Sequence, residues 1–142
     1  MLRSWKLALV VLAAGVVIAG FSATDGSRGL AVVQLAVFVV LAALFSPLAF
    51  PRSVSVDEAA RRGKPIVYWR PGCQYCLRLR LTLTGVTGRA SWVNIWTDPA
   101  AAAAVRAVAD GNETVPTVVL GGESRVNPDP RWVRERLRAG AA

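Results

Sequence analysis

The feature that most constrains this chain is a pair of long apolar runs within its first 50 residues. From Trp5 to Phe21 the only charge is Lys6, and Leu30 to Phe50 has no charged residue in 21 positions. A helix needs about 20 mostly apolar residues to cross a bilayer, within a range of roughly 17–25. Residues 22–29 between the runs are small and polar, which predicts a turn. We therefore predict a transmembrane helical hairpin, with spans at about residues 5–21 and 30–50, and a membrane anchor over residues 1–50.

The first run has two alternative interpretations. A basic start, an apolar middle and the small residues Gly20 and Ser22 are also typical of a cleaved signal peptide. The second run is too long and too apolar for a signal, so we expect membrane attachment in either case. Two buried core helices of a soluble protein are the weaker alternative, because neither run has a polar face.

The basic residues that flank the runs predict the orientation of the anchor. Arg3 and Lys6 precede the first run, whereas the loop between the runs holds only Arg28. Further basic residues follow the second run: Arg52, Arg61, Arg62 and Lys64. Because basic flanks favour the cytoplasmic side, we predict a multi-pass protein of the cell membrane with both termini in the cytoplasm.

The composition changes at Pro51. Of the 17 Lys and Arg residues 14 lie from Pro51 onward, as do eight of the nine acidic residues, so this part carries +6 of the net charge of +8. The arginines are spread over every expected element without an RNA-binding signature, so we expect no nucleic-acid partner. A simpler explanation of the positive charge is that Arg61, Arg62 and Lys64 are attracted to anionic membrane lipid.

The rest of the chain has the pattern of an α/β domain over residues 65–142, after a linker and short helix over 51–64. Ser55 and Glu58 have capping-box spacing, and Gly63 and Pro65 end that helix. The expected order is strand 66–69, helix from 73 to about 84, strand 91–96, helix 100–109, strand 114–120, strand 124–126 and helix 131–138. Alternating leucines at 77–83 leave a strand as the alternative there, but the spacing of Cys76, Leu79, Leu83 and Val86 favours a helix.

The chain contains two cysteines and no histidine. Histidine bases and metal sites that need histidine or four cysteines are therefore excluded within one chain. Cys73 and Cys76 are separated by two residues at an expected helix start, where free N–H groups and the helix dipole stabilise a thiolate. This spacing predicts Cys73 as nucleophile and Cys76 as the resolving thiol. An intermolecular metal site or a structural pair is the alternative.

A proline about 40 residues downstream adds context to the cysteines. One interpretation of Pro116, in the run Thr114-Val115-Pro116, is a proline at the start of an edge strand. The sharper interpretation is a cis-proline that faces the thiolate and leaves the Val115 backbone free to pair with a substrate. Arg70, Arg78 and Arg80 add positive potential near Cys73.

Two stretches resemble the signatures of glutaredoxins, and of actinobacterial mycoredoxins in particular. They are Trp69-Arg70-Pro71-Gly72-Cys73-Gln74-Tyr75-Cys76-Leu77-Arg78-Leu79 and Asn112-Glu113-Thr114-Val115-Pro116-Thr117-Val118. The resemblance covers roughly residues 64–137 and leaves out both apolar runs. It implies a thioredoxin fold and reduction of protein disulfides, or of mixed disulfides between a protein and a small thiol. Mycothiol or glutathione is the implied co-substrate, with no bound cofactor and no metal.

The resemblance also implies roles for individual residues. Cys73 would take over the small thiol, and either a second small thiol or Cys76 would then release it. The implied thiol-binding groove contains Arg70, Tyr75, Thr114, Val115 and Pro116, together with Asn127 and Asp129, which match the family's pattern only loosely. Gln74 departs from the usual Pro or Gly. We expect a monomer whose partners are disulfide-bearing proteins and membrane lipid.

Two other functions fit the same sequence. One is a thioredoxin-like electron donor that receives electrons directly from a flavin reductase. The other is a non-catalytic membrane redox sensor or scaffold, whose thiols only report the redox state.

Overall fold

The computed structural model describes residues 2–140 and contains two compact units, one ending at Ala49 and one beginning at Phe50. The boundary differs from the expected one, because residues 50–64 belong to the second unit and are not a free linker. Each unit is described by itself.

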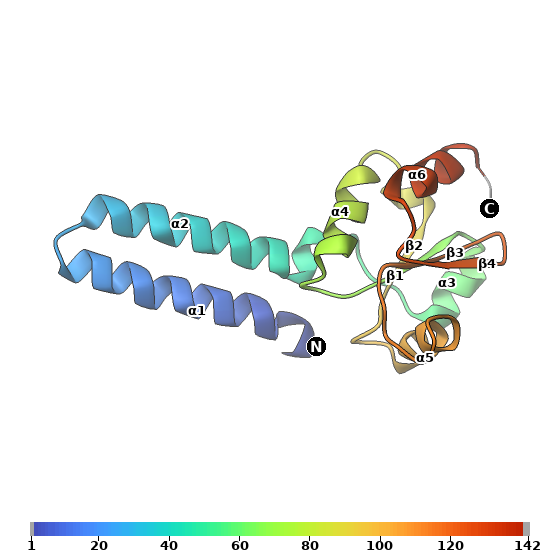
Figure 1. Cartoon of the computed structure of the whole chain (residues 1–142), viewed down its shortest axis with the longest axis horizontal. Helices are drawn as coiled ribbons and strands as arrows, with labels where there is room; N and C mark the ends of the chain where they lie inside the picture. The colour runs from blue at the N-terminus through green and yellow to red at the C-terminus, as the bar shows by residue number, and fades with distance from the viewer. Residues whose placement is uncertain (1, 141–142) are drawn as a thin grey trace. The chain divides into compact units, whose positions relative to one another are not determined.

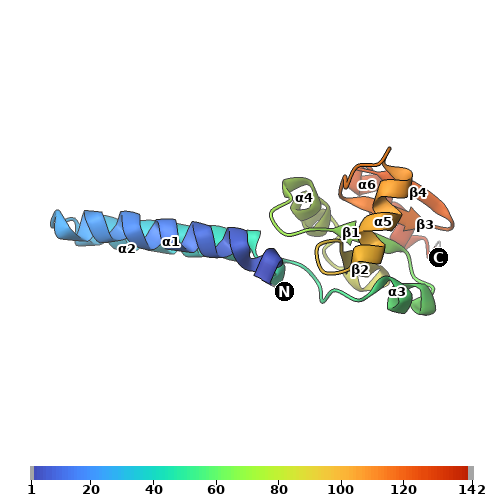
Figure 2. The ribbon, with the colours of Figure 1, turned by 90° about the horizontal axis from the view of Figure 1, so that it is seen from below.

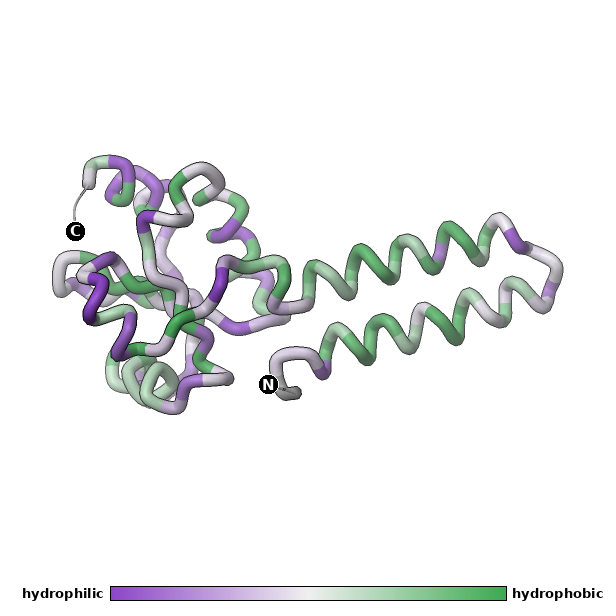
Figure 3. The backbone as a smooth tube through the Cα atoms, turned by 180° about the vertical axis from the view of Figure 1, so that it is seen from behind, coloured by the Kyte–Doolittle hydropathy of each residue, from purple (hydrophilic) through white to green (hydrophobic). Residues whose placement is uncertain are grey.

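The first unit is a helical hairpin of α1 (Leu2–Thr24) and α2 (Arg28–Phe45). Both helices are long and apolar enough to cross a membrane by length and composition, and Figure 3 shows the polar turn between them. Few residues in the apolar windows are buried, 17% in α1 and 11% in α2, unlike the core helices of a soluble protein. The helices approach closely at Gly15, where a Cβ atom would overlap the Phe38 side chain.

The second helix is shorter than the apolar run that predicted it. We expected a span over 30–50, but α2 ends at Phe45 and Ser46 is extended. A 3-10 helix, Pro47–Ala49, follows. Pro47 has no N–H to continue the α-helical hydrogen bonds, which explains the early end.

The second unit is a mixed four-stranded sheet with strand order β2-β1-β3-β4. β1 pairs in parallel with β2 and antiparallel with β3, which pairs antiparallel with β4. Helices α4 and α6 lie on one side of the sheet, and α3 and α5 on the other (Figures 1 and 2). The elements are α3 (Val56–Arg62), β1 (Ile66–Trp69), α4 (Gln74–Thr82), β2 (Ser91–Asn94), α5 (Pro99–Val108), β3 (Thr117–Leu120), β4 (Glu123–Val126) and α6 (Pro130–Arg138). This is the expected thioredoxin-like α/β fold.

The helix ends follow local rules of capping. The Ser55 side chain accepts the N–H of Glu58, and Gly63 ends α3 in the left-handed conformation, with φ +60°. Asp98 and Asp129 cap α5 and α6, each followed by proline in the first turn. The strand interpretation of residues 77–83 was wrong, because Leu79 and Leu83 are buried whereas Leu81 is 62% exposed, which is helical periodicity.

Two strands are shorter than expected. β2 ends at Asn94, because the Asn94 side chain accepts the N–H of Trp96 and the chain turns. β3 begins at Thr117, directly after Pro116, which has no N–H to donate to a neighbouring strand. Trp92 lies in the core, while Trp96 and Trp132 are half-buried.

Candidate active site

Cys73 lies where the chain passes from the central strand into a helix. β1 ends at Trp69, a short loop follows, and Cys73 is the N-cap of α4. Its sulfur takes the place of a capping oxygen, because Sγ accepts the N–H of Cys76 at 3.2 Å. Cys73 is half-buried, so its sulfur is open to a partner, whereas Cys76 is fully buried.

The surroundings of Cys73 lower the pKa of its thiol from 9.0 to about 7. The largest cause is the hydrogen bond from the Cys76 side chain, and the backbone N–H of Cys76, the Arg70 charge and the N–H of Tyr75 act in the same direction. Partial burial of Cys73 opposes them. A substantial fraction of Cys73 is therefore thiolate at neutral pH, and the thiolate is the nucleophilic form.

Cys76 behaves in the opposite way. Burial raises the pKa of its thiol, and the neighbouring Cys73 adds to the effect. Cys76 therefore keeps its proton and offers it to Cys73 as a hydrogen-bond donor. The two sulfurs differ in state because one faces the surface and the other faces the core.

The loop that carries Pro116 faces Cys73. The peptide bond between Val115 and Pro116 is cis, as the sequence suggested. The Cys73 S–H donates to the Val115 carbonyl at a sulfur–oxygen distance of 3.4 Å. Thr114 is exposed, and its carbonyl accepts the Thr117 hydroxyl at 2.8 Å. Of the predicted residues of this loop, Val115 is therefore the one that contacts the candidate nucleophile directly.

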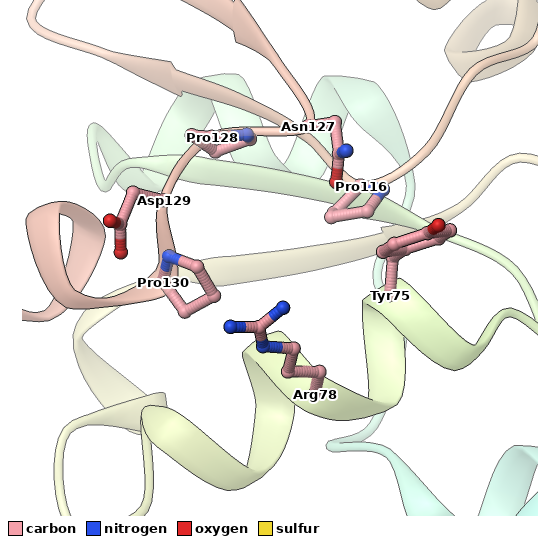
Figure 4. Close-up of a pocket in the computed structure, with 7 residues that line it drawn as sticks. All are labelled: Tyr75, Arg78, Pro116, Asn127, Pro128, Asp129 and Pro130. Atoms are coloured by element: carbon pink, nitrogen blue, oxygen red, sulfur yellow. The ribbon is translucent and has the colours of Figure 1, made fainter.

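A pocket of about 330 Å³ lies between the N-terminal half of α4, the Pro116 loop and the start of α6 (Figure 4). The N–H of Asn127 donates to the Pro116 carbonyl at 2.7 Å, which joins two of these segments. The residues that line the pocket are Tyr75, Arg78, Pro116, Asn127, Pro128, Asp129 and Pro130.

Four of the predicted thiol-binding residues line this pocket: Tyr75, Pro116, Asn127 and Asp129. The other three, Arg70, Thr114 and Val115, do not. Arg70 acts on the Cys73 thiol by its charge, and its guanidinium lies 5.9 Å from the centre of the Trp96 ring.

Three of the lining residues were not predicted for the groove: Arg78, which was expected only as a positive charge near Cys73, Pro128 and Pro130. Figure 4 shows the Arg78 guanidinium extending from α4 toward Pro130. A signal for Arg78 was present, because residues three apart on a helix share a face and Arg78 follows Tyr75 by three. Arg78 brings a positive charge to a pocket whose Asp129 carboxylate caps α6 by accepting the N–H of Arg131 at 2.7 Å.

The described residues contain no cluster of three or more side chains suited to hold a metal ion. The site itself offers a reactive thiolate, a second buried thiol and an adjacent polar pocket.

Comparison with known proteins agrees with this geometry. Residues 66–125 match the sequence profile of the family described as Glutaredoxin. Two proteins of Mycobacterium tuberculosis, from strains CDC 1551 / Oshkosh and ATCC 25618 / H37Rv, bear the name "Putative glutaredoxin". Each is 39% identical over 72 residues, which cover 50% of this chain and 86% of the relative. No solved structure matches the chain.

Proposed function

Since this chain belongs to the glutaredoxin family and is a thiol–disulfide oxidoreductase, we propose that it reduces protein mixed disulfides from a membrane anchor, with Cys73 as nucleophile and Cys76 as resolving thiol. The observation that carries the proposal is the lowered pKa of Cys73, about 7, beside a pocket large enough for part of a small thiol. Protein disulfides are a second substrate of the same chemistry.

The first step transfers the small thiol to the enzyme. The Cys73 thiolate attacks the sulfur of the small thiol in the mixed disulfide, so a bond forms between Cys73 and that sulfur while the protein–sulfur bond breaks. The substrate cysteine leaves as a thiolate and takes a proton from water. No net oxidation occurs in this exchange, because one disulfide replaces another.

Two routes then return Cys73 to its thiol form. In the first, a second small thiol attacks as its thiolate, releases Cys73 and leaves as a small-molecule disulfide, which carries away the two oxidising equivalents. In the second, Cys76 loses its proton and attacks the Cys73 sulfur, so the small thiol leaves as its thiolate and a Cys73–Cys76 disulfide forms. Two further small-thiol molecules then reduce that disulfide and are released together as a small-molecule disulfide, which returns Cys73 to its thiol form. Because Cys76 is buried and its pKa is raised, we expect the first route to carry most of the turnover.

The pocket is our proposed site for the small thiol. Tyr75 and Pro116 offer apolar surface, while Asn127, Asp129 and Arg78 offer polar partners (Figure 4). The resemblance to mycoredoxins supports mycothiol as co-substrate, with glutathione as the other candidate. Arg70, Thr114 and Val115 are proposed to act next to the sulfur and not in the pocket.

The membrane anchor is part of the proposal. Its support is the length and apolar composition of α1 and α2 together with their exposed apolar side chains. The basic residues outside the spans favour a cytoplasmic location for both ends of the chain. In that location the redox domain meets the small-thiol pool of a reducing compartment.

The test is turnover of a peptide mixed disulfide by the full-length protein in detergent or vesicles. We expect turnover with mycothiol and a mycothiol-disulfide reductase, and none in Cys73→Ser. Arg78→Ala should raise the KM for the small thiol, whereas Arg138→Ala, an exposed control outside the pocket, should not. Turnover only with a thioredoxin reductase would favour the electron-donor alternative, and equal activity of Cys73→Ser would favour the scaffold.

A further inference from the structure

The folded redox domain begins well before the part that matches the family. The family profile starts at residue 66, yet Phe50 is already buried in the second unit, with 8% of its surface exposed. Its ring stacks on Trp69 with a centroid distance of 4.0 Å and lies 6.2 Å from the ring of Trp92. Trp69 is the last residue of β1, the strand that leads to Cys73.

Hydrogen bonds attach the residues after Phe50 to the same part of the domain. The Val54 N–H donates to the Trp92 carbonyl at 2.9 Å, and the Ser53 hydroxyl accepts the N–H of Asn94 at 2.8 Å. The Val56 N–H donates to the Asp98 carboxylate at 2.8 Å. Because β2 is an edge strand, residues 53–54 occupy hydrogen-bonding groups that would otherwise be open. Residues 50–56 are therefore part of the folded domain and do not lengthen the linker between the domain and α2.

The tether, by which we mean the residues between the end of α2 and the folded domain, is short. Helix α2 ends at Phe45, so only residues 46–49 separate the helix from the first packed residue, Phe50. Fully extended chain advances at most about 3.6 Å per residue, so this tether spans at most roughly 18 Å. If the domain began where the family match begins, about 20 residues of tether would reach roughly 70 Å. The packing of residues 50–56 thus shortens the maximum distance between α2 and the folded domain from roughly 70 Å to roughly 18 Å.

From this we propose that the packed segment keeps Cys73 close to the membrane, and that among disulfides held by proteins of the same membrane it reduces those in the membrane-proximal parts. The proposal rests on the membrane anchoring and redox activity proposed above. A domain of this size is about 30 Å across, so Cys73 stays within about 50 Å of the end of α2 in any orientation. Substrates held farther from the surface are out of reach.

The experiment uses the full-length protein in phosphatidylcholine vesicles with one reporter, a peptide that carries mycothiol as a mixed disulfide. The near reporter is attached to a lipid headgroup directly, and the far reporter through a semi-rigid helical spacer of 60 residues, about 90 Å long. A free peptide measures the intrinsic activity. In one variant 60 Gly/Ser residues are inserted between Ala49 and Phe50, which adds an r.m.s. reach of about 40–45 Å.

We expect the native protein to reduce the near reporter at least tenfold faster than the far one, because a shared surface raises the effective concentration only where both groups can meet. The insertion should raise the rate on the far reporter at least fivefold. The same insertion between Gly26 and Ser27, in the turn between α1 and α2, lengthens the chain but not the tether and should change nothing.

Equal native rates on the near and far reporters, with activity on the free peptide intact, would overturn the short reach. So would a tether insertion that leaves the ratio of the two rates unchanged. Loss of activity on the free peptide would instead contradict the redox function itself, and failure of the protein to float with the vesicles would contradict the anchor.

Discussion

At Cys73 the main stabilising partner of the sulfur is another cysteine. The sequence predicted a lowered pKa from free backbone N–H groups at a helix start, and those donors are present at Cys76 and Tyr75. The largest effect, however, comes from the Cys76 side chain. A sequence shows that two cysteines are one helical turn apart, but the burial that keeps the second one protonated depends on the packed core.

This arrangement predicts the pH dependence of the nucleophile. Alkylation by iodoacetamide requires the thiolate, so the rate for Cys73 should be half-maximal at about pH 7 and rise to a plateau above it. Cys76→Ala removes the largest stabilising donor, so the pKa of Cys73 should rise and the midpoint should move to higher pH.

The matched control is Gln74→Ala, an exposed position within the same motif that is not among the groups that shift the Cys73 pKa. Its midpoint should equal that of the native protein. An unchanged midpoint in Cys76→Ala would show that the Cys76 side chain does not set the acidity of Cys73.

Among the elements, the sequence predicted the order of helices and strands because each has a local signal. Caps at Ser55, Asp98 and Asp129 and apolar periodicity over α4 depend only on neighbouring residues. Strand bounds were less predictable, since β2 ends where the Asn94 side chain bonds to the backbone and β3 begins only after Pro116. The role of Phe50 was missed because an apolar residue that faces lipid and one that faces a protein core look alike in a sequence.

Phe50 gives the clearest test of the segment that precedes the family match. Replacing a buried Phe by Ala costs about 3–5 kcal/mol, and Phe50→Ala also removes the stacking on Trp69. For a domain of this size each kcal/mol lowers Tm by roughly 4–8 °C, so a decrease of at least 10 °C is expected. Tryptophan fluorescence of the full-length protein in detergent during heating measures it.

Leu48→Ala is the control, because Leu48 lies two residues earlier and is 73% exposed. Its Tm should stay within about 2 °C of the native value, since surface substitutions usually change stability by less than about 0.5 kcal/mol. If Phe50→Ala melted at the native temperature, the domain would not depend on residues before the family match.

The hairpin of α1 and α2 has its own packing constraint at Gly15. A Cβ atom there would overlap Cβ and Cγ of Phe38, atoms close to the backbone of α2, so the helices would have to separate. Gly15→Ala should therefore loosen the hairpin, measured as greater distance between fluorophores placed at the two helix ends. Gly20→Ala meets open space and should have no effect. Equal distances in both variants would contradict this packing.

At the scale of the whole molecule, the excess of apolar residues and the excess of positive charge belong to different parts. The apolar residues lie in α1 and α2, whereas +6 of the net charge of +8 lies from Pro51 onward. The composition changes at Pro51, within one residue of the boundary between the two units, but it did not show that residues 50–64 belong to the second unit. The pocket was also only partly foreseen, because Arg78 and the proline-rich start of α6 come together through tertiary packing.

The basic flanks predict a cytoplasmic location for the redox domain, and this location can be measured directly. In intact cells a membrane-impermeant maleimide should fail to label Cys73, and it should label Cys73 after the membrane is permeabilised. Because Cys76 is fully buried, the label should be found on Cys73 alone. Labelling of Cys73 in intact cells would place the domain outside and contradict the predicted orientation.

The central claim is that Cys73 takes over a small thiol from a protein, and intact-mass spectrometry of a single turnover tests it most directly. The reduced full-length protein, with Cys76→Ser to prevent resolution, is mixed with an excess of a peptide that carries mycothiol as a mixed disulfide. The enzyme should gain the mass of one mycothiol, located on Cys73, while the peptide is released as a free thiol. An enzyme bearing the peptide itself, or no mass change at all, would contradict it.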